Sequence, residues 1–302
     1  MFDDVAGVPE FSTASFPSDP FLAHELVHAI QHDATTVASL PDIPDALAAR
    51  QGVVEGTAEY VEGRYRTACS EETFHPCTVR ESALRIADVP LWLIPGRLPY
   101  INGSAFAHET LQRGGWDLLW EKTRTPPETA VEIMFPDIHY NGGFTLSQLS
   151  PHPSRSENWE RSAIGQLGVN ALYLKLRAHD IADPTDADAA TDPDLTTETG
   201  IEHAFRHDLL REWRGDYMTT YISENNRIAT HWTTSWADTQ TAREITDAIV
   251  ATYDQRARSD DIGWQVGNGF VTVDRTDTTV EFAYAPSQEA ISTISTAETQ
   301  SD

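Results

Sequence analysis

The sequence predicts an α+β fold: a mainly helical first half, followed by a helix and a ββαββ module. Apolar residues recur at helical spacing in the first half, whereas short runs rich in β-branched and aromatic residues appear after residue 216. Residues 141–156 are rich in Gly, Pro and Ser and separate the two parts. We therefore expect one domain over 1–150, a second over 151–286, and a polar tail over 287–302.

The first predicted element is a helix over residues 18–33, for which Asp19 can serve as the N-cap. Its apolar residues recur at helical spacing: Phe21, Leu22, Leu26, Val27 and Ile30. His24, Glu25 and His28 lie inside this helix as H-E-x-x-H. Residues four apart on a helix are about 6 Å apart along its axis, so both imidazoles can reach one metal ion and Glu25 lies beside it. A zinc hydrolase needs this arrangement of ligands and carboxylate.

The second predicted helix, residues 52–65, offers a third metal ligand. Glu55 follows His28 by 27 residues, beyond a loop with two prolines, so the chain has room to run a helix back past the first. His32 is an alternative nitrogen ligand because it lies one turn after His28, although a solvated or structural role is also open to it. Glu62 is interpreted as a surface carboxylate.

These two segments resemble the gluzincin metallopeptidases, in which a Glu on a following helix completes H-E-x-x-H. The match is to members that read HExxHxxQ and then EGxA, here residues 24–31 and 55–58. Residues 69–77 and 99–140 are similar to a haloarchaeal family of surface metallopeptidases. The resemblance implies a gluzincin-like metallopeptidase domain in the helical half. Gluzincins also carry a β-sheet ahead of this helix, and 18 residues are too few for one, so we expect a truncated chain or one without that substrate platform.

The resemblance also implies roles for individual residues. Zinc would be bound by His24, His28 and Glu55. Glu25 would be the general base, and Glu59 would orient a ligand imidazole from one turn beyond Glu55.

Four further residues complete the predicted site and its setting. Tyr140, and with it Tyr100, is a candidate for the group that stabilises the oxyanion, with core packing as the alternative role.

Cys69 and Cys77 are the only cysteines and lie in one polar stretch, so they form either a small disulfide-closed loop or a free dithiol. The resemblance favours the disulfide and an extracellular or cell-surface location. A cytoplasmic location stays open because no signal peptide is visible.

The chain is strongly acidic. Its 302 residues include 47 acidic and 21 basic ones, for a net charge of -26, and Lys122 and Lys175 are the only lysines. A lysine-poor acidic surface is typical of halophilic proteins, because concentrated salt screens the repulsion between carboxylates. This charge argues against nucleic acid and anionic membranes as partners. No run approaches the roughly 18 to 20 apolar residues of a transmembrane helix.

Local turn and periodicity signals predict the remaining elements. In the first half we expect a turn at 102–103, a helix over 103–120 broken at 114–115, and another helix from residue 126. In the second half we expect, in order, a helix over 159–179, an acidic loop over 182–200, a short helix over 201–213, strands over 217–222 and 228–236 around a turn at 225–226, a helix from Asp238 to Arg256, and a hairpin of 270–274 and 279–283. No cluster of metal ligands or nucleophiles is apparent in this second half.

The predicted function is zinc-dependent hydrolysis of a peptide bond in a peptide or protein substrate. Two alternatives stay open: a surface or scaffold protein that keeps a structural zinc, and a zinc hydrolase that acts on non-peptide bonds. An open cleft that leads to the metal would distinguish the enzyme from the scaffold, because a catalytic zinc keeps one coordination position open. The oligomeric state is not predicted.

Overall fold

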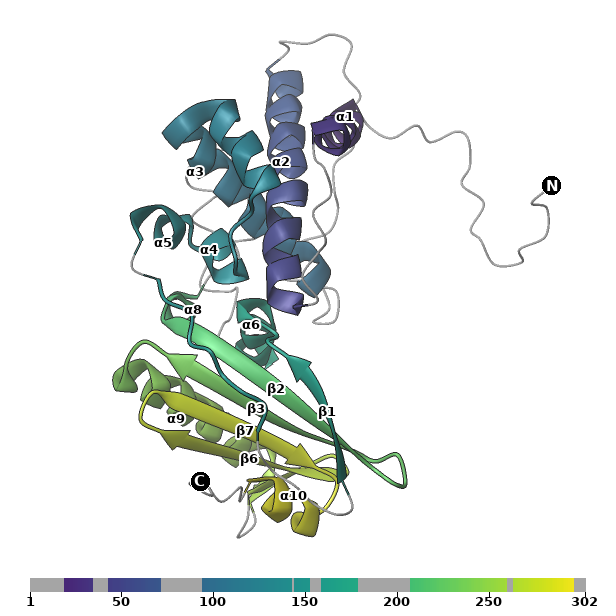
Figure 1. Cartoon of the computed structure of the whole chain (residues 1–302), viewed down its shortest axis with the longest axis vertical. Helices are drawn as coiled ribbons and strands as arrows, with labels where there is room; N and C mark the ends of the chain where they lie inside the picture. Colours follow the sequence, from purple (N-terminus) through teal and green to yellow (C-terminus); the bar gives the residue numbers. More distant parts are fainter. Residues whose placement is uncertain are drawn as a thin grey trace, which may run out of the picture.

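The structure is a computed structural model that describes residues 19–34, 43–71, 94–142, 144–152, 159–178, 207–259 and 263–295. A group of helices from the first half of the chain lies beside an antiparallel sheet from the second half (Figure 1). The predicted α+β class is therefore confirmed. Within these ranges, none of the helices combines the length and the apolar composition needed to cross a membrane. The predicted loop over 182–200 lies outside the described residues, as does Cys77.

The helices are α1 (Asp19–Ala34), α2 (Pro44–Ser70), α3 (Ile94–Arg124), α4 (Ala130–Met134), α5 (Pro136–Asn141), α6 (Val169–Ala178), α8 (Asp208–Arg211), α9 (Thr239–Arg256) and α10 (Gln288–Ser295). The strands are β1 (Trp159–Gly165), β2 (Trp213–Ser223), β3 (Ile228–Trp236), β4 (Arg258–Ser259), β5 (Trp264–Val266), β6 (Gly269–Thr276) and β7 (Thr279–Ala285).

The seven strands form one antiparallel sheet in the order β1-β2-β3-β7-β6-β5-β4. Two hairpins and the helix between them match the predicted ββαββ module. The turns contain Asn226 and Asp277, which have φ of 56° and 50°, a conformation that Asn and Asp adopt more readily than most residues. Asp238 caps α9 by accepting hydrogen bonds from the backbone N–H groups of Gln240 and Thr241.

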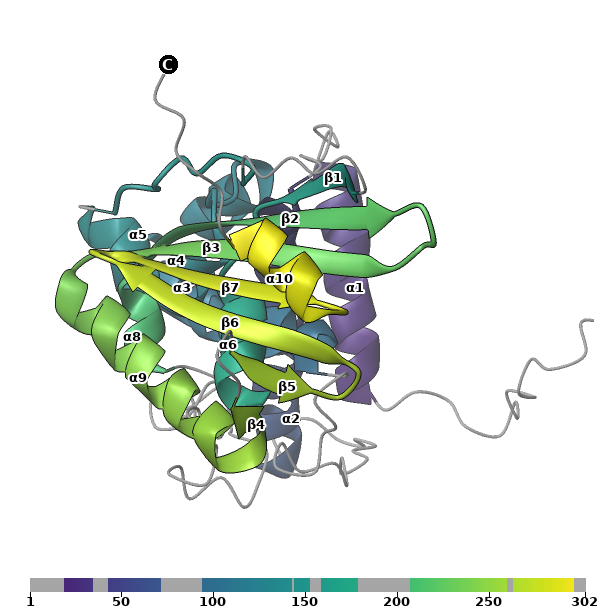
Figure 2. The same cartoon turned by 90° about the horizontal axis from the view of Figure 1, so that it is seen from below.

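Helices cover both faces of the sheet (Figure 2). On one face α6 and α9 pack around the aromatic residues Trp232, Trp236 and Phe282. On the other face α10 packs through Ile291 and Ile294. Residues of α3 and α4 belong to the first of these cores, so apolar packing is continuous from the helical half to the sheet. The predicted division into domains near residue 150 stays a prediction.

The helices α2 and α3 approach each other backbone to backbone. A Cβ atom on Gly56 would lie 2.0 Å from the carbonyl carbon of Gly103, and one on Gly103 would lie 1.9 Å from the carbonyl oxygen of Gly52. The predicted turn at 102–103 is therefore wrong, because α3 continues through these residues. Gly103 lies where α3 crosses α2, and its missing side chain lets the two backbones come close together. The predicted break at 114–115 is confirmed, since Gly115 has non-helical angles of φ 64° and ψ -163°.

The predicted helix over 159–179 is wrong in its first part. Residues Trp159–Gly165 form β1, which pairs with β2, and α6 begins only at Val169. Gly165 and Gly168 have φ of 98° and 84°, so the backbone between strand and helix cannot be helical. Pairing with a strand far along the chain outweighs the helical periodicity of these residues.

The predicted polar tail over 287–302 is wrong in its first part. Residues Gln288–Ser295 form α10, in which Ala290, Ile291 and Ile294 are buried. These three side chains make a narrow apolar stripe in an otherwise polar segment, and the sheet supplies the surface that covers it.

Three helix boundaries differ from the predicted ones. The helix predicted over 52–65 extends over Pro44–Ser70. The helix predicted from residue 126 begins at Ala130, behind a capping box formed by Thr129 and Glu132. The short helix predicted over 201–213 is the single turn α8 within the described residues, because β2 already begins at Trp213.

Candidate metal centre

The helix α1 packs against α2 through the side that carries His24 and His28, and not through its most apolar side. His24, Val27 and Gln31 are buried. The apolar residues on the other side of the helix are exposed: Phe21, Leu22, Leu26 and Ile30. Most of the apolar residues that predict this helix therefore do not pack against α2. The interface with α2 is built on polar side chains, which need partners when buried.

His24, His28 and Glu55 come together between α1 and α2. The two Nε2 atoms are 3.1 Å apart, and Glu55 Oε2 lies 3.3 Å from His28 Nε2 and 3.7 Å from His24 Nε2. A tetrahedral zinc with bonds of about 2.0 to 2.2 Å holds its ligand atoms about 3.3 to 3.6 Å apart. The donor set and its spacing therefore fit a divalent metal ion.

Two more carboxylates of α2 face the other ring nitrogen of His24. Glu62 Oε2 lies 3.3 Å from His24 Nδ1, and Glu59 Oε2 lies 3.9 Å from it. The contact with Glu62 is an ion pair without hydrogen-bond alignment, because this buried Nδ1 makes no hydrogen bond of standard geometry within the described residues. Glu62 also accepts a 2.6 Å hydrogen bond from Arg66. Glu62 is thus not the surface carboxylate that was predicted, and its side chain is only 12% exposed.

The position of Glu62 could have been read from the sequence. Glu55, Glu59 and Glu62 are spaced i, i+4 and i+7, which puts all three on one face of a helix. That face is the one α2 turns toward His24.

The carboxylates make the surroundings of His24 electronegative. Burial lowers the pKa of His24, but the contact with Glu62 and the charges of Glu59 and Glu55 outweigh it and raise this pKa above its ordinary value. Burial and the neighbouring charge of Glu62 raise the pKa of Glu59. Burial would also raise the pKa of Glu62, yet His24 and Arg66 hold it below its ordinary value. Such a site favours a bound cation.

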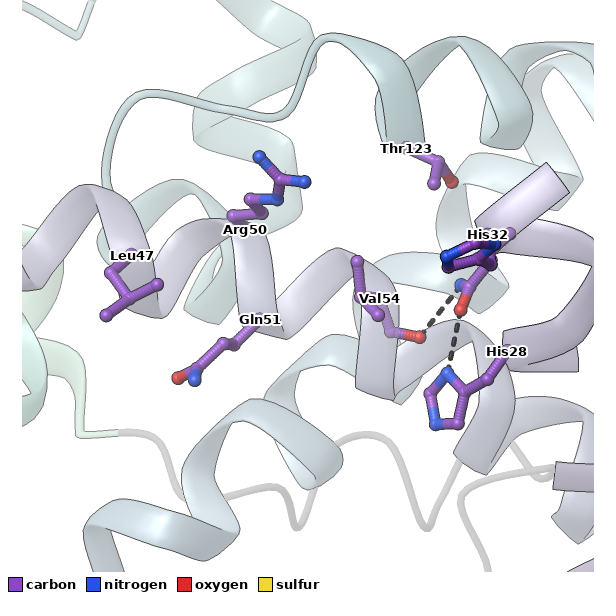
Figure 3. A pocket seen from close by; sticks show the side chains of 8 residues that line it. His28, His32, Leu47, Arg50, Gln51, Val54 and Thr123 are labelled. Carbon is purple, nitrogen blue, oxygen red and sulfur yellow. Dashed lines mark hydrogen bonds between the residues drawn. The ribbon is translucent and has the colours of Figure 1, made fainter. Parts of the chain in front are cut away.

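Gln31 anchors His28. Its side-chain Oε1 lies 2.9 Å from His28 Nδ1, and its Nε2 donates a 3.0 Å hydrogen bond to the backbone oxygen of Val54 (Figure 3). This contact favours the tautomer of His28 with its proton on Nδ1, in which the lone pair of Nε2 can bind a metal ion between His24 and Glu55. No role was predicted for Gln31 beyond its place in HExxHxxQ. Its signal is the helical spacing of three residues from His28.

Of the two candidate tyrosines, Tyr100 lies at this site. Its ring stacks against His24 at a centroid distance of 6.2 Å, and it lies close enough to Glu55 for that carboxylate to affect its pKa. Burial and the charge of Glu55 raise the pKa of Tyr100. Tyr140 lies in a different cluster, where its hydroxyl is 2.6 Å from Thr110 Oγ1.

One side of the centre is accessible. The side chain of His24 is 8% exposed, but those of His28 and Glu55 are 26% and 25% exposed. A cavity of about 350 Å³ adjoins His28 (Figure 3). It is lined by His28, Gln31 and His32 from α1, by Arg50 and Gln51 from α2, and by Thr123 from α3, among others.

The other predicted site residues have different surroundings. Glu25 and His32 are exposed on α1, and neither belongs to a group of converging ligand atoms within the described part of the chain. Cys69 is near the end of α2 and is disulfide-bonded. Since Cys77 lies outside the described residues, the pairing of Cys69 with Cys77 stays a prediction.

The comparison with known proteins found a match for the sheet half of the chain, and not for the helices that carry this centre. Residues 158–295 match the profile of a domain of unknown function, DUF8575. No curated protein and no solved structure matches the chain. The matched segment begins just before β1 and ends with α10, so it contains all strands of the described residues and none of the residues of the candidate metal centre.

Proposed function

We propose that this chain is a zinc-dependent hydrolase of peptide bonds with a gluzincin-like site. The observation that carries the proposal is the convergence of His24 Nε2, His28 Nε2 and Glu55 Oε2 at distances of 3.1 to 3.7 Å. Two imidazoles and one carboxylate are the protein ligands of several catalytic zinc ions. The proposed reaction is hydrolysis within a peptide or protein substrate.

Each side chain has a task in this proposal. A zinc ion held by the three ligands would polarise the substrate carbonyl and activate water. Glu25 follows His24 on α1 and is exposed, and in the proposed reaction its carboxylate would take a proton from the attacking water and pass it to the leaving amine. The Tyr100 hydroxyl, beside Glu55, can donate a hydrogen bond to the oxygen on which negative charge develops.

Accessibility favours catalysis over a structural role for the metal. A structural zinc is closed by four protein ligands, whereas this group has three. His28 and Glu55 are each about a quarter exposed, and a cavity reaches His28. The exposed parts of His28 and Glu55 would thus give a substrate access to the metal. The scaffold alternative requires a closed site.

The test compares variants that separate metal binding from turnover. His28→Ala and Glu55→Ala should lose zinc, because each removes one of three protein ligands. Glu25→Gln should keep stoichiometric zinc while the cleavage of a peptide library falls by about 100-fold or more, because the amide cannot act as a base. Glu128→Gln, at an exposed glutamate outside the site, is the matched control.

Three outcomes would contradict the proposal in different ways. Loss of zinc from Glu25→Gln would make Glu25 a ligand. Stoichiometric zinc without cleavage of any peptide would favour the scaffold. Cleavage of ester substrates alone would favour a hydrolase of non-peptide bonds.

A further inference from the structure

The imidazole of His24 lies between two carboxylates of α2. Its Nε2 is 3.7 Å from Glu55 Oε2, and its Nδ1 is 3.3 Å from Glu62 Oε2. Glu55 and Glu62 are seven residues apart, which is about two helical turns, so one face of α2 carries both. One ring nitrogen therefore faces the three converging ligand atoms, and the other faces a separate carboxylate.

The Nδ1 atom of His24 is buried without a hydrogen bond of standard geometry within the described residues. A metal ion bound at Nε2 uses the lone pair of that atom, so the neutral ring then carries its proton on Nδ1. A buried N–H group without an acceptor is unfavourable, and solvent does not reach this atom. A metal-bound His24 therefore requires a protein acceptor beside Nδ1.

Glu62 is better placed than Glu59 to be that acceptor. Glu62 Oε2 lies 3.3 Å from Nδ1, a distance that allows a hydrogen bond once the two groups are aligned, whereas Glu59 Oε2 lies 3.9 Å away. The side chain of Glu62 is 12% exposed, and that of Glu59 is 33% exposed. Arg66 donates a 2.6 Å hydrogen bond to the other oxygen of Glu62, Oε1, so Oε2 stays available to His24.

We propose that Glu62 is the positioning residue of His24: it accepts the Nδ1 proton and holds the ring with Nε2 toward the metal. The resemblance to gluzincins implies this task for Glu59, and the distances favour Glu62 instead. The inference rests on the zinc site of the proposed function, but it does not depend on peptide cleavage.

The two histidines would then have different partners. Gln31 contacts His28 through a neutral amide, whereas His24 would have a carboxylate. A carboxylate partner raises the basicity of a ligand imidazole, and a hydrogen bond to a charged acceptor is stronger than one to an amide. His24 would therefore be the stronger nitrogen ligand of the two.

The first experiment measures the zinc affinity of the full chain by competition with a chromogenic chelator. Glu62→Met keeps the length of the side chain but removes the acceptor, so the affinity should fall by about 10- to 100-fold. Glu59→Met is the matched control, because it removes a carboxylate that faces the same ring from the same helix. Each variant loses one negative charge near the metal, so the effect of charge is common to both. The fall should be at least about tenfold smaller in Glu59→Met.

Glu62→Gln separates the hydrogen bond from the charge. Its amide oxygen can accept the Nδ1 proton, as that of Gln31 does for His28, so this variant should recover part of the affinity that Glu62→Met loses. A contact that only fills space would not be restored in this way, because Met and Gln are similar in size. Urea unfolding checks that the variants fold. If Glu62→Met does not fold, Glu62→Gln should still lower the affinity more than Glu59→Gln does.

The second experiment follows the Nδ1 proton itself by NMR of the cobalt(II)-loaded chain. The N–H group of each metal-bound imidazole gives a shifted signal that disappears in heavy water. Gln31→Met should change the signal of His28, which assigns it. Glu62→Met should shift the His24 signal and speed its exchange with water, because a hydrogen-bonded buried N–H exchanges slowly. Glu59→Met should leave that signal as in the wild type.

The outcomes separate this inference from the proposed function. Equal losses of affinity in Glu62→Met and Glu59→Met, with an unchanged His24 signal, would overturn the inference. A second zinc ion per chain that Glu62→Met removes would also overturn it, because Glu62 would then be a metal ligand with Glu59 and His24 Nδ1. The expected losses in a chain that cleaves no peptide would support the inference and overturn the peptidase. Zinc-dependent cleavage, with full zinc affinity in Glu62→Met, would overturn the inference and leave the peptidase.

Discussion

Gln31 links the candidate metal centre to the backbone of the neighbouring helix. It is buried, and its amide group contacts His28 Nδ1 on one side and the carbonyl of Val54 on the other. Both ends of the amide therefore have partners, which is what a buried polar group requires. The same contacts set the orientation of the imidazole relative to Glu55, which lies one residue beyond Val54. Residues that hydrogen-bond to a metal ligand affect metal affinity even though they do not touch the metal.

Replacing Gln31 should weaken zinc binding without removing a ligand. In Gln31→Met the side chain keeps its length but loses both hydrogen bonds, so zinc affinity should fall by about 10- to 100-fold. Gln31→Glu keeps an acceptor for His28 and should lose less. Competition with a chromogenic chelator measures the affinity, with Gln265→Ala at an exposed position as the control. Equal affinity of Gln31→Met and the wild type would mean that His28 is oriented by other contacts.

The pair α2 and α3 determines where Glu55 lies. Gly56, the residue after Glu55, touches the backbone of Gly103 in α3. The EGxA pattern therefore has a packing reason beside its metal ligand, because only glycine permits this distance between the two backbones. A shift of α2 away from α3 would move Glu55 relative to the histidines of α1.

Gly56→Ala should destabilise the fold and disturb the metal centre together. The added methyl would lie 2.0 Å from a backbone atom, so the helices must separate, at a cost of about 1–3 kcal/mol in the free energy of unfolding. Zinc affinity should fall as well, since Glu55 moves. Urea unfolding and zinc titration measure the two effects.

The matched control is Gly96→Ala, also in a helix. A Cβ atom there has no heavy atom within 4 Å, so this variant should be neutral or more stable by about 0.5–1 kcal/mol, because Ala is the better helix former. If both variants had the same stability, Gly56 would not be needed for the close approach of α2 and α3.

At the scale of the whole molecule, Asp45 joins the helical half to the sheet half. It lies in the first turn of α2 and is fully buried. Its carboxylate accepts a 3.2 Å hydrogen bond from the backbone N–H of Ala130 and a 2.8 Å one from Gln166 in the turn after β1. Burial raises the pKa of Asp45 to about 7, and these hydrogen bonds only partly oppose it.

Asp45 should make the fold less stable as the pH rises toward neutrality. The folded protein holds this proton up to about pH 7, whereas an unfolded Asp releases it near pH 4, so stability falls between these two values. The full effect over about three pH units is about 4 kcal/mol. Asp45→Asn cannot ionise, and the amide of Gln166 can rotate to pair with it. Relative to the wild type, this variant should therefore gain stability between pH 5 and pH 8.

Urea unfolding at both pH values and constant salt measures this difference. Asp117→Asn, at an exposed aspartate, should show the pH dependence of the wild type. A wild type and an Asp45→Asn variant with parallel pH profiles would show that Asp45 is ionised throughout, or that it titrates without affecting folding.

Local signals account for the parts of the fold that were predicted correctly. A capping aspartate and the apolar spacing predict α9, and turn residues at 226 and 277 predict the two hairpins. These signals act over a few residues, so neighbouring sequence is sufficient to read them. The same holds for α1, because the spacing of His24 and His28 needs only a helix to bring their side chains to one face.

By itself, the sequence determined the α+β class, the H-E-x-x-H helix and the place of Glu55 on the next helix. Only the tertiary structure decided which side of α1 is buried, because a helix with an apolar side and a histidine side shows no preference until α2 supplies the carboxylates. The tertiary structure likewise decided that residues 159–165 form a strand and that residues 288–295 form a helix. It also decided that Gly103 lies inside a helix, at the point where α3 crosses α2, and not in a turn. The physical reason is the same in each case: the deciding partner is far along the chain, and its contacts outweigh the local preference of the segment.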